Sequence, residues 1–227
     1  MLECRLQKHL AYHKPFIGVH HIAGHIYANE LVEDIEYPCL CLVVSGGHSE
    51  LVYMKSEFSF EVIGQTLDDA IGEAYDKAGR VLHLPYPGGP VIDKMAASGQ
   101  HTYDLPLPLN DDSYNFSFSG LKSAVINLCH NAAQRGEDIV PADLACSFQE
   151  VALDVLVSKT IKAAKDYQVK EIIVAGGVSA NRGLRKKLTA DSPIKVLFPP
   201  MAYCTDNAAM IASAARVMYE HQQFSSL

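Results

Sequence analysis

The sequence lacks several features that assign a chain to a common class. Its six cysteines are scattered without any C-x-x-C pair, which argues against a zinc ribbon, a thioredoxin-type redox pair and a disulfide scaffold. No apolar run reaches the ~20 residues that a membrane-spanning helix needs, and the first residues lack the order of a signal peptide. We therefore expect reduced cysteines, no membrane and a cytoplasmic location.

Positive charge is also scarce. The chain has 19 Lys and Arg residues against 26 Asp and Glu residues, for a net charge of −7. Because non-specific binding to nucleic acid comes mainly from neutralising phosphates, this balance argues against a stand-alone nucleic-acid binder. A basic cluster at Arg182, Arg185, Lys186 and Lys187 is either a local RNA contact or the solvated face of a helix.

The best-known nucleotide motifs, G-x-x-x-x-G-K-[ST] and G-x-G-x-x-G, are both absent. Glycine pairs nevertheless occur at 46–47 and 176–177, each after an apolar run, and at 88–89. A tight turn without a ligand is the default interpretation of one such pair, but glycine turns also let backbone N–H groups approach a phosphate. Several of them in one α/β chain favour a nucleotide cleft, and polar groups that suit a ribose or base lie in or beside these turns at Asp76, Asp93 and Asn181.

Two histidines stand four residues apart, at His21 and His25, which places both imidazoles on one face of a helix. Such a pair is half of a metal site, although it also occurs as an ordinary surface or core feature. The best candidate for a third ligand is Asp206, which lies just before a strongly helical run. A metalloprotease of the H-E-x-x-H type needs a Glu directly after the first His, and here that position is Ile22.

The apolar periodicity predicts a mixed α/β order, with three strands, a helix, an all-helical insertion and then strand, helix, strand, helix. Asp68 and Asp69 are expected at the start of the first of these helices, where negative charge suits the helix dipole. The segments 86–90 and 105–108 are expected to break regular structure. The predicted strands are 38–45, 49–55, 58–63, 170–174 and 195–198, and the predicted helices are 67–84, 118–133, 141–167, 181–189 and 206–219.

The chain resembles a known family along most of its length. The shared motifs are Val19-His20-His21-Ile22-Ala23-Gly24-His25, Val43-Val44-Ser45-Gly46-Gly47-His48-Ser49, Gly64-Gln65-Thr66-Leu67-Asp68-Asp69-Ala70 with Gly72-Glu73-Ala74-Tyr75-Asp76-Lys77, Tyr86-Pro87-Gly88-Gly89-Pro90, Phe116-Ser117-Phe118-Ser119-Gly120-Leu121-Lys122, Gly176-Gly177-Val178-Ser179-Ala180-Asn181 and Cys204-Thr205-Asp206-Asn207-Ala208. In this order they resemble the TsaD-type tRNA threonylcarbamoyladenosine transferases, once described as O-sialoglycoprotein endopeptidases.

The resemblance implies an α/β fold of the actin-like, sugar-kinase-like ATPase (ribonuclease H-like) type, built from two lobes. The acidic phosphate segment that opens the family's first lobe has no counterpart here. We therefore expect a remnant of the N-terminal lobe at 1–35, the C-terminal nucleotide-binding lobe with its helical insertion at 36–206, and a terminal helix at 207–227 that returns to the first lobe. Apolar surface on 208–218 is then expected to be exposed and to favour self-association.

The resemblance also implies a ligand set. His21, His25 and Asp206 would hold one divalent metal ion, iron or zinc. An ATP- or AMP-type nucleotide would lie against the positions Val43, Val44, Ser45, Gly46, Gly47, Asp76, Gly89, Asp93 and Asn181.

The implied reaction transfers the threonylcarbamoyl group of threonylcarbamoyl-AMP to the adenosine next to the anticodon of tRNA. The implied protein partners are a smaller TsaB-like paralogue and a TsaE-like ATPase. Two alternatives are a metal-dependent glycoprotease, which lacks its Glu here, and a non-catalytic nucleotide-binding module, which would not need three convergent ligands.

Overall fold

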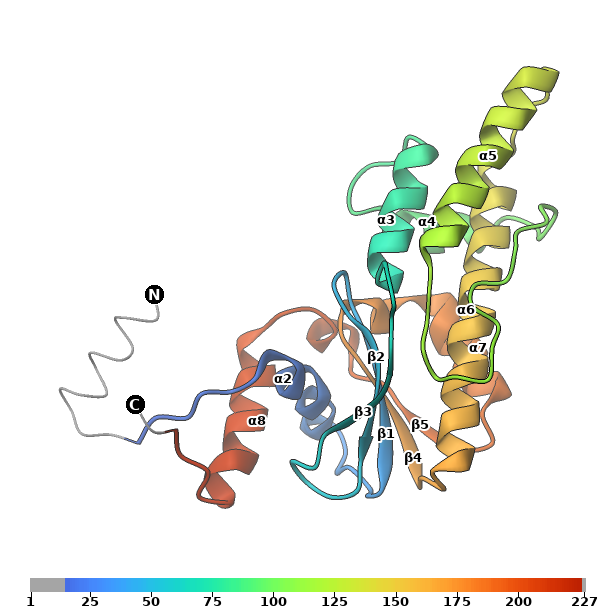
Figure 1. Ribbon diagram of the computed structural model, residues 1–227. Helices are drawn as coiled ribbons and strands as arrows, with labels where there is room; N and C mark the ends of the chain where they lie inside the picture. The colour runs from blue at the N-terminus through green and yellow to red at the C-terminus, as the bar shows by residue number, and fades with distance from the viewer. Residues whose placement is uncertain (1–14, 226–227) are drawn as a thin grey trace.

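The computed structural model describes residues 15–225 and is built on a mixed sheet with the strand order β3-β2-β1-β4-β5 (Figure 1). Strands β1, β4 and β5 are parallel to one another, and β2 is antiparallel to both β1 and β3. The strands are β1 (Cys39–Val44), β2 (Ser49–Met54), β3 (Glu61–Gln65), β4 (Glu171–Ala175) and β5 (Lys195–Leu197).

Helices cover both faces of this sheet, and α5 with the first part of α6 projects beyond its end (Figure 1). The helices are α2 (His21–Tyr27), α3 (Ile71–Val81), α4 (Gly88–Ala96), α5 (Ser119–Arg135), α6 (Pro141–Asp166), α7 (Arg182–Asp191) and α8 (Ala208–Glu220). Short 3-10 turns are η1 (Ala28–Leu31), η2 (Gly177–Ala180) and η3 (Met201–Tyr203). None of the helices in the described range is long and apolar enough to cross a membrane.

The central strand β1 divides the core in two because its side chains alternate between the faces. Leu40, Leu42 and Val44 lie in the larger core with α3, α6 and α7, whereas Cys41 and Val43 lie in the smaller core with α2 and α8. All five are fully buried. Burial of a Val or Leu side chain contributes roughly 1.5–3 kcal/mol, so this strand is a main stabilising element of the sheet.

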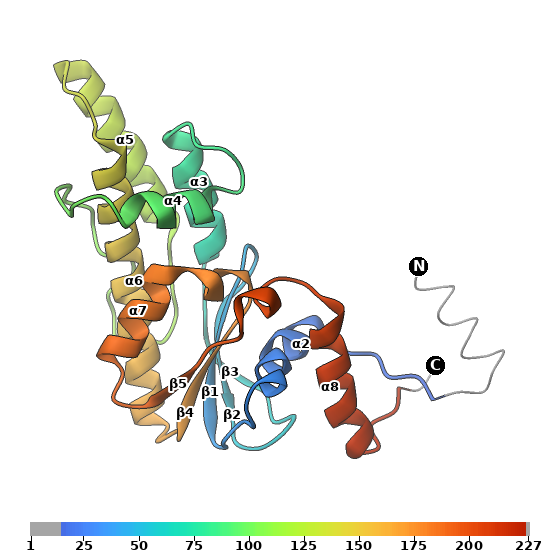
Figure 2. The same ribbon diagram turned by 180° about the vertical axis from the view of Figure 1, so that it is seen from behind.

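The smaller core is closed by α2 and α8, which lie side by side over one face of the sheet (Figure 2). Ala214 and Val217 of α8 lie in this core, and Met210 of the same helix is also buried. The expectation that the apolar surface of 208–218 would be exposed is therefore wrong for these three residues, because α2 covers them.

The first helix after the hairpin begins later than predicted. Helix α3 starts at Ile71, whose backbone N–H donates to the Ser49 hydroxyl at 2.8 Å, so Asp68 and Asp69 lie before its first turn. Asp68 instead accepts hydrogen bonds from residues at the start of α5. Sequence periodicity could not reveal this, because it depends on a contact between distant segments.

Two further predictions, for the segment 86–90 and for the third strand, are wrong in part. The segment 86–90 does not simply interrupt regular structure: α4 begins at Gly88, and Pro90 lies in the first helical turn, where proline is tolerated. The third strand, predicted at 58–63, lies at Glu61–Gln65. The other predicted elements agree with the structure to within about two residues.

Candidate metal centre and adjoining cleft

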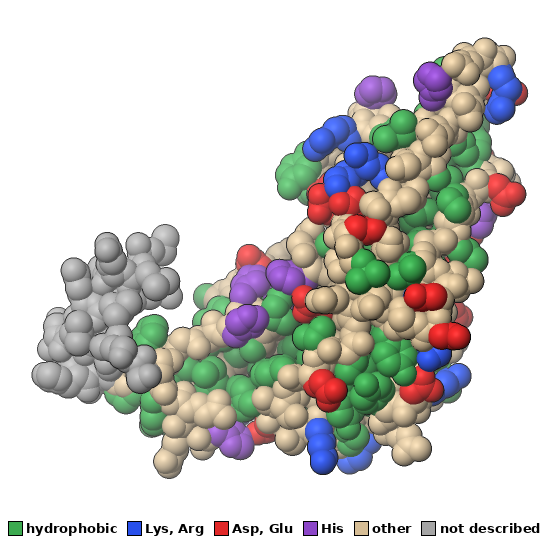
Figure 3. Space-filling view, viewed as in Figure 1, with side chains coloured by type: hydrophobic (Ala, Val, Ile, Leu, Met, Phe, Trp, Pro, Cys, Tyr) green, Lys and Arg blue, Asp and Glu red, His purple; other side chains and the backbone are tan. Residues whose placement is uncertain are grey.

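Helix α2 presents His21 and His25 to the same side. The rings of His21 and His25 pack edge to face, with their centroids 4.7 Å apart. His25 is only 3% exposed, whereas His21 is exposed. Figure 3 shows histidine side chains gathered on this side of the molecule. The four-residue spacing therefore produces the paired imidazoles that it predicts.

Asp206 reaches this pair from the other end of the chain. It precedes Asn207, whose side chain caps α8 by accepting a hydrogen bond from the Met210 N–H at 2.9 Å. Because α8 packs on α2, the carboxylate Oδ1 of Asp206 lies 3.1 Å from Nε2 of His25 and 3.4 Å from Nε2 of His21. One candidate ligand atom from each of the three residues lies within 4.8 Å of the other two.

The electrostatics of His25 favour the neutral imidazole. Burial, followed by the neighbouring His21 ring, lowers the pKa of His25, and the Asp206 carboxylate opposes this shift without reversing it. A neutral imidazole keeps a lone pair for a metal ion. Its other nitrogen, Nδ1, is buried and has no hydrogen-bond partner among the described residues.

This donor set fits a divalent transition metal. Two imidazole nitrogens and one carboxylate oxygen are typical of catalytic zinc sites and of non-haem iron(II) sites, both of which leave coordination positions open. The lowered pKa of His25 reduces the competition of protons for this ligand. Magnesium and calcium, which prefer oxygen ligands, fit it poorly.

A cleft of about 540 Å³ adjoins the three residues. Besides the metal candidates it is lined by Ser45, Gly46, Gly47, His48, Gly177 and Thr205. His48, Gly177 and Thr205 were not among the residues assigned to the site, although each lies within one of the family motifs and Gly177 belongs to a glycine pair that was considered for phosphate binding. A larger hollow of about 660 Å³ along α6 and α7 contains none of the predicted site residues.

The three lining glycines have no structural reason to be glycine. A Cβ atom added to Gly46, Gly47 or Gly177 would meet nothing within 4 Å, and none of the three has a positive φ. Gly176 differs, because its φ is +91° and a Cβ there would lie 2.4 Å from the Val44 carbonyl oxygen. The three open glycines therefore leave space in the cleft that the protein itself does not fill.

The neighbouring predicted residues differ in what they can offer a ligand. Val43 and Val44 are fully buried, so their side chains face the two cores and not the cleft. Ser45 Oγ accepts hydrogen bonds from the N–H groups of Gly47 at 3.3 Å and His48 at 3.0 Å, which shapes the turn. The family resemblance is what assigned Val43 and Val44 to the site, and in the structure they form the end of β1 before the glycine turn.

Asp76 and Asp93 accept hydrogen bonds at the starts of two helices, α4 and α7. Asp76 on α3 accepts a hydrogen bond from the Gly88 N–H at 2.7 Å, at the start of α4. Asp93 on α4 accepts from the N–H groups of Arg182 at 3.1 Å and Gly183 at 3.2 Å, at the start of α7. These two carboxylates thus link α3, α4 and α7, and they do not line the cleft.

Asn181 and Gly89 belong to the same group of helix ends. Asn181 caps α7 by accepting from the Leu184 N–H at 2.7 Å, and its amide donates to Gln149 Oε1 at 2.9 Å. Gly89 lies in the first turn of α4, and a Cβ atom added to it would lie 3.7 Å from the Cβ of Tyr75. The structure thus brings Asp76, Gly89, Asp93 and Asn181 together around the starts of α4 and α7.

Comparison with solved structures identifies the fold. The chain is similar to full-length HypF in its phosphate- and nucleotide-bound form, with a TM-score of 0.67, 13% identity and coverage of 92% of this chain and 37% of that chain. It is also similar to HypF from T. kodakarensis, with a TM-score of 0.60, 14% identity and coverage of 88% and 37%. The predicted actin-like, sugar-kinase-like α/β fold is confirmed.

Comparison of sequences identifies close relatives. The tRNA N6-adenosine threonylcarbamoyltransferase of Bacillus subtilis is 62% identical over 215 residues, which are 92% of this chain and 62% of that protein. Those of Bacillus licheniformis and of one Bacillus cereus strain are 61% and 59% identical, covering 91% and 94% of this chain. The chain spans 62% to 64% of the length of these relatives.

The family model for TsaD, tRNA N6-adenosine threonylcarbamoyltransferase, matches residues 7–213, which include all three metal candidates and the whole cleft lining. Together with the identities above, this match shows that the chain belongs to the TsaD family.

Proposed function

We propose that this chain binds threonylcarbamoyl-AMP and serves the transfer of its threonylcarbamoyl group to the N6 amine of the adenosine next to the tRNA anticodon. The observation that carries the proposal is that His21, His25 and Asp206 converge beside a cleft lined by open glycines. A scaffold needs neither the convergent ligands nor the unfilled space.

His21, His25 and Asp206 would hold one iron or zinc ion. When bound, the ion would supply a Lewis-acid charge that polarises an oxygen of the substrate. The burial of His25 keeps its imidazole neutral and available as a ligand, and the exposed carboxylate of Asp206 supplies the negative charge of the donor set.

The glycine turns would hold the adenylate. Gly46, Gly47 and Gly177 carry no side chain that would keep a phosphate away from the backbone N–H groups, and such groups bind anions well. The helix-end group of Asp76, Gly89, Asp93 and Asn181 would contact the ribose and base. Val43 and Val44 would act only by ending the strand that positions the first turn.

The transfer itself needs no covalent enzyme intermediate. The N6 nitrogen attacks the carbamoyl carbon, AMP leaves with the electrons of the broken C–O bond, and the nitrogen loses one proton. Ser45 and His48 lie near each other, with Oγ and Nδ1 3.5 Å apart, but Ser45 Oγ already accepts two backbone hydrogen bonds. This arrangement favours a turn-forming serine over a nucleophile, and so favours direct transfer.

The proposal extends to domains and partners. We assign residues 1–35 and 207–227 to the side of the first lobe, because α2 and α8 pack on each other, and 36–206 to the nucleotide-binding lobe. The partners are tRNA, a TsaB-like paralogue and a TsaE-like ATPase, with self-association as a further property, and the location is the cytoplasm. The nucleotide is of the ATP or AMP type.

A direct assay tests the function. The purified chain, its partner proteins, zinc or iron(II), threonylcarbamoyl-AMP and a tRNA that reads codons beginning with A are combined, and threonylcarbamoyladenosine is measured by mass spectrometry of the digested tRNA. We expect product with the wild-type chain and with His20→Ala, and none with His25→Ala. Absence of product from the complete wild-type mixture would refute the proposal.

A further inference from the structure

The Arg185 side chain on α7 joins segments that are distant from its own helix. Its Nε donates to the Ser179 carbonyl oxygen at 2.7 Å, and its Nη2 donates to the Pro199 carbonyl oxygen at 2.6 Å. The same Nη2 lies 3.3 Å from the Cys204 sulfur, and the guanidinium stacks over the Phe198 ring at 4.9 Å. One side chain thus holds two separate stretches of backbone.

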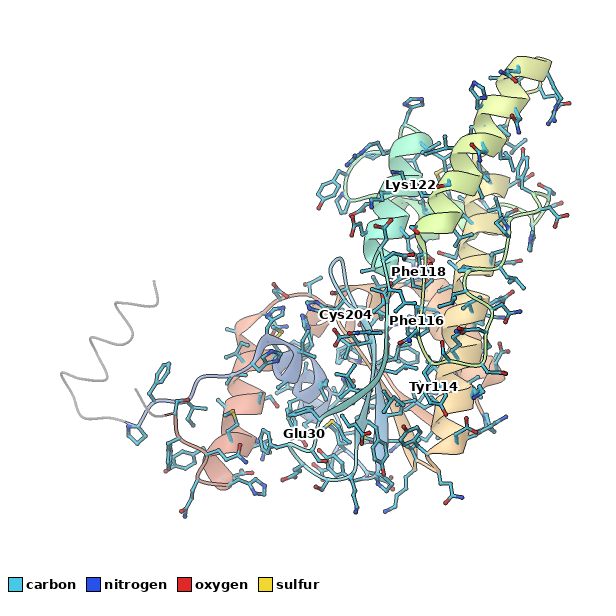
Figure 4. The ribbon with its side chains drawn as sticks, viewed as in Figure 1. Glu30, Tyr114, Phe116, Phe118, Lys122 and Cys204 are labelled. Carbon is cyan, nitrogen blue, oxygen red and sulfur yellow. The ribbon has the colours of Figure 1, made fainter. Side chains whose placement is uncertain are left out.

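Both stretches lead directly to the cleft. Ser179 lies in η2, which contains the lining residue Gly177. Cys204 is followed by Thr205 and Asp206, which line the cleft from another segment. Figure 4 labels Cys204 in the segment that leads to α8. Arg185 therefore connects the glycine turn with the segment that carries a metal-binding carboxylate.

The segment from Phe198 to Cys204 has little regular structure of its own. Pro199 and Pro200 have no N–H groups, so they cannot donate to a neighbouring strand. The regular structure in it is the three-residue turn η3, with the Tyr203 N–H donating to the Pro200 carbonyl at 2.8 Å. The planar guanidinium supplies donors in a fixed fork, which a lysine ammonium cannot reproduce.

We propose that Arg185 is a positioning residue for the metal centre, fixing Asp206 at the distance from His21 and His25 that the donor set requires. It acts through Cys204 and the two carbonyl groups and does not touch the metal itself. This inference rests on the proposed metal site.

The first experiment measures zinc affinity by competition with a chromophoric chelator in Arg185→Lys, Arg185→Gln and the control Lys186→Gln, which removes an exposed charge from the same helix. Residues that orient metal ligands change affinity by about 10- to 100-fold. We expect zinc affinity to fall by that amount in both Arg185 variants, because the planar fork of guanidinium donors is required and a positive charge alone is not enough. Lys186→Gln should keep the wild-type affinity. Wild-type affinity in Arg185→Lys would overturn the proposal.

Replacing the metal with cobalt(II) gives a second readout, the absorption spectrum, which reports the ligands of the metal and not the overall stability of the protein. Displacement of the carboxylate should alter the d–d absorption spectrum of Arg185→Gln, while Lys186→Gln keeps the wild-type spectrum. Cys204→Ala, which leaves both carbonyl contacts in place, is a milder variant in case the Arg185 variants fold poorly, and we expect a smaller shift in the same direction. An unchanged spectrum in all folded variants would count against the positioning role.

Hydrogen exchange of the metal-free protein separates this inference from the proposed function. We expect faster exchange of amides in 201–210 in Arg185→Gln than in wild type and in Lys186→Gln. If wild type binds no metal but this exchange still accelerates, the metal function fails while the positioning of the segment stands. Equal exchange rates would overturn the positioning role whatever the metal result.

Discussion

Nε2 of His25 lies 3.1 Å from Oδ1 of Asp206, although the two residues come from opposite ends of the chain. The contact exists because α2 and α8 pack on each other over the smaller core. Gly24 lies at this contact, where an added Cβ would come within 2.9 Å of Ile211 Cδ1. The metal candidates are therefore brought together by helix packing and not by a single loop.

Removal of one imidazole should abolish metal binding. His25→Ala deletes a buried donor, and we expect the bound metal, measured by elemental analysis, to fall from about one per chain to background. His20→Ala removes the adjacent exposed histidine and should keep the metal. Equal metal content in both variants would show that the ion lies elsewhere.

Adding a methyl group at the open glycines should leave the stability of the fold unchanged but should weaken the binding of AMP. Gly47→Ala and Gly177→Ala face empty space, so their melting temperatures should stay near wild type. A methyl group in a filled pocket costs affinity on the order of 10- to 200-fold, and we expect such a loss for AMP by calorimetry. Gly120→Ala, also open but outside the cleft, is the control. AMP affinity that is unchanged in both cleft variants would contradict an adenylate site at these turns.

Gly72 should behave in the opposite way, because its space is taken by backbone. A Cβ at Gly72 would lie 2.6 Å from the Ser45 carbonyl oxygen and 2.9 Å from Gly46 Cα. We expect Gly72→Ala to lower the free energy of unfolding by about 1–3 kcal/mol in chemical denaturation. Gly89→Ala, whose Cβ would be 3.7 Å from Tyr75 Cβ, should not lower it. If the two variants have the same free energy of unfolding, the close approach of α3 to the Ser45 turn does not contribute to stability.

Asp68 should make stability depend on pH. Partial burial, the largest single influence, raises the pKa of Asp68, but hydrogen bonds from Ser117, Phe118 and Ser119 outweigh it and lower the pKa below its usual 3.8. A carboxyl group with a depressed pKa in the folded state stabilises the fold above its unfolded pKa, and this contribution disappears as the pH falls through the folded pKa.

The measurement for Asp68 is urea unfolding of Asp68→Asn between pH 3 and 7. At pH 7 we expect a loss of about 0.5–1.5 kcal/mol, toward the lower end because water screens this exposed group. The difference from wild type should shrink below about pH 4. The matched control, Asp104→Asn at another exposed position, should show no such trend. A difference that is constant across the whole range would mean that the Asp68 charge does not contribute.

Local patterns were sufficient for most of the elements and for part of the candidate site. The apolar runs predicted β1 and β4, and the spacing of His21 and His25 predicted two imidazoles on one helix face. The glycine pairs predicted turns at the strand ends, and the turns at Gly46 and Gly177 line the cleft. These features depend on backbone geometry within a few residues, so a single sequence carries them.

The remaining features depended on contacts that periodicity does not describe. Asp68 was expected in the first turn of a helix but accepts hydrogen bonds from the start of α5. Asp76 and Asp93 looked like free polar groups, but they cap α4 and α7. A carboxylate in a sequence has several possible donors, and only the packing of the helices selects one.

The sequence by itself determined the strand and helix order, the paired histidines and the glycine turns, because each is set by the period of the chain and the freedom of its backbone. The sequence offered Asp206 as a candidate partner of the histidines, but only the tertiary structure established its contact with His25. Only the tertiary structure also decided that Val43 and Val44 face the cores and that Arg185 joins two segments of the cleft. The physical reason is that these contacts join residues far apart along the chain, whose meeting depends on how α2, α7 and α8 pack against one sheet.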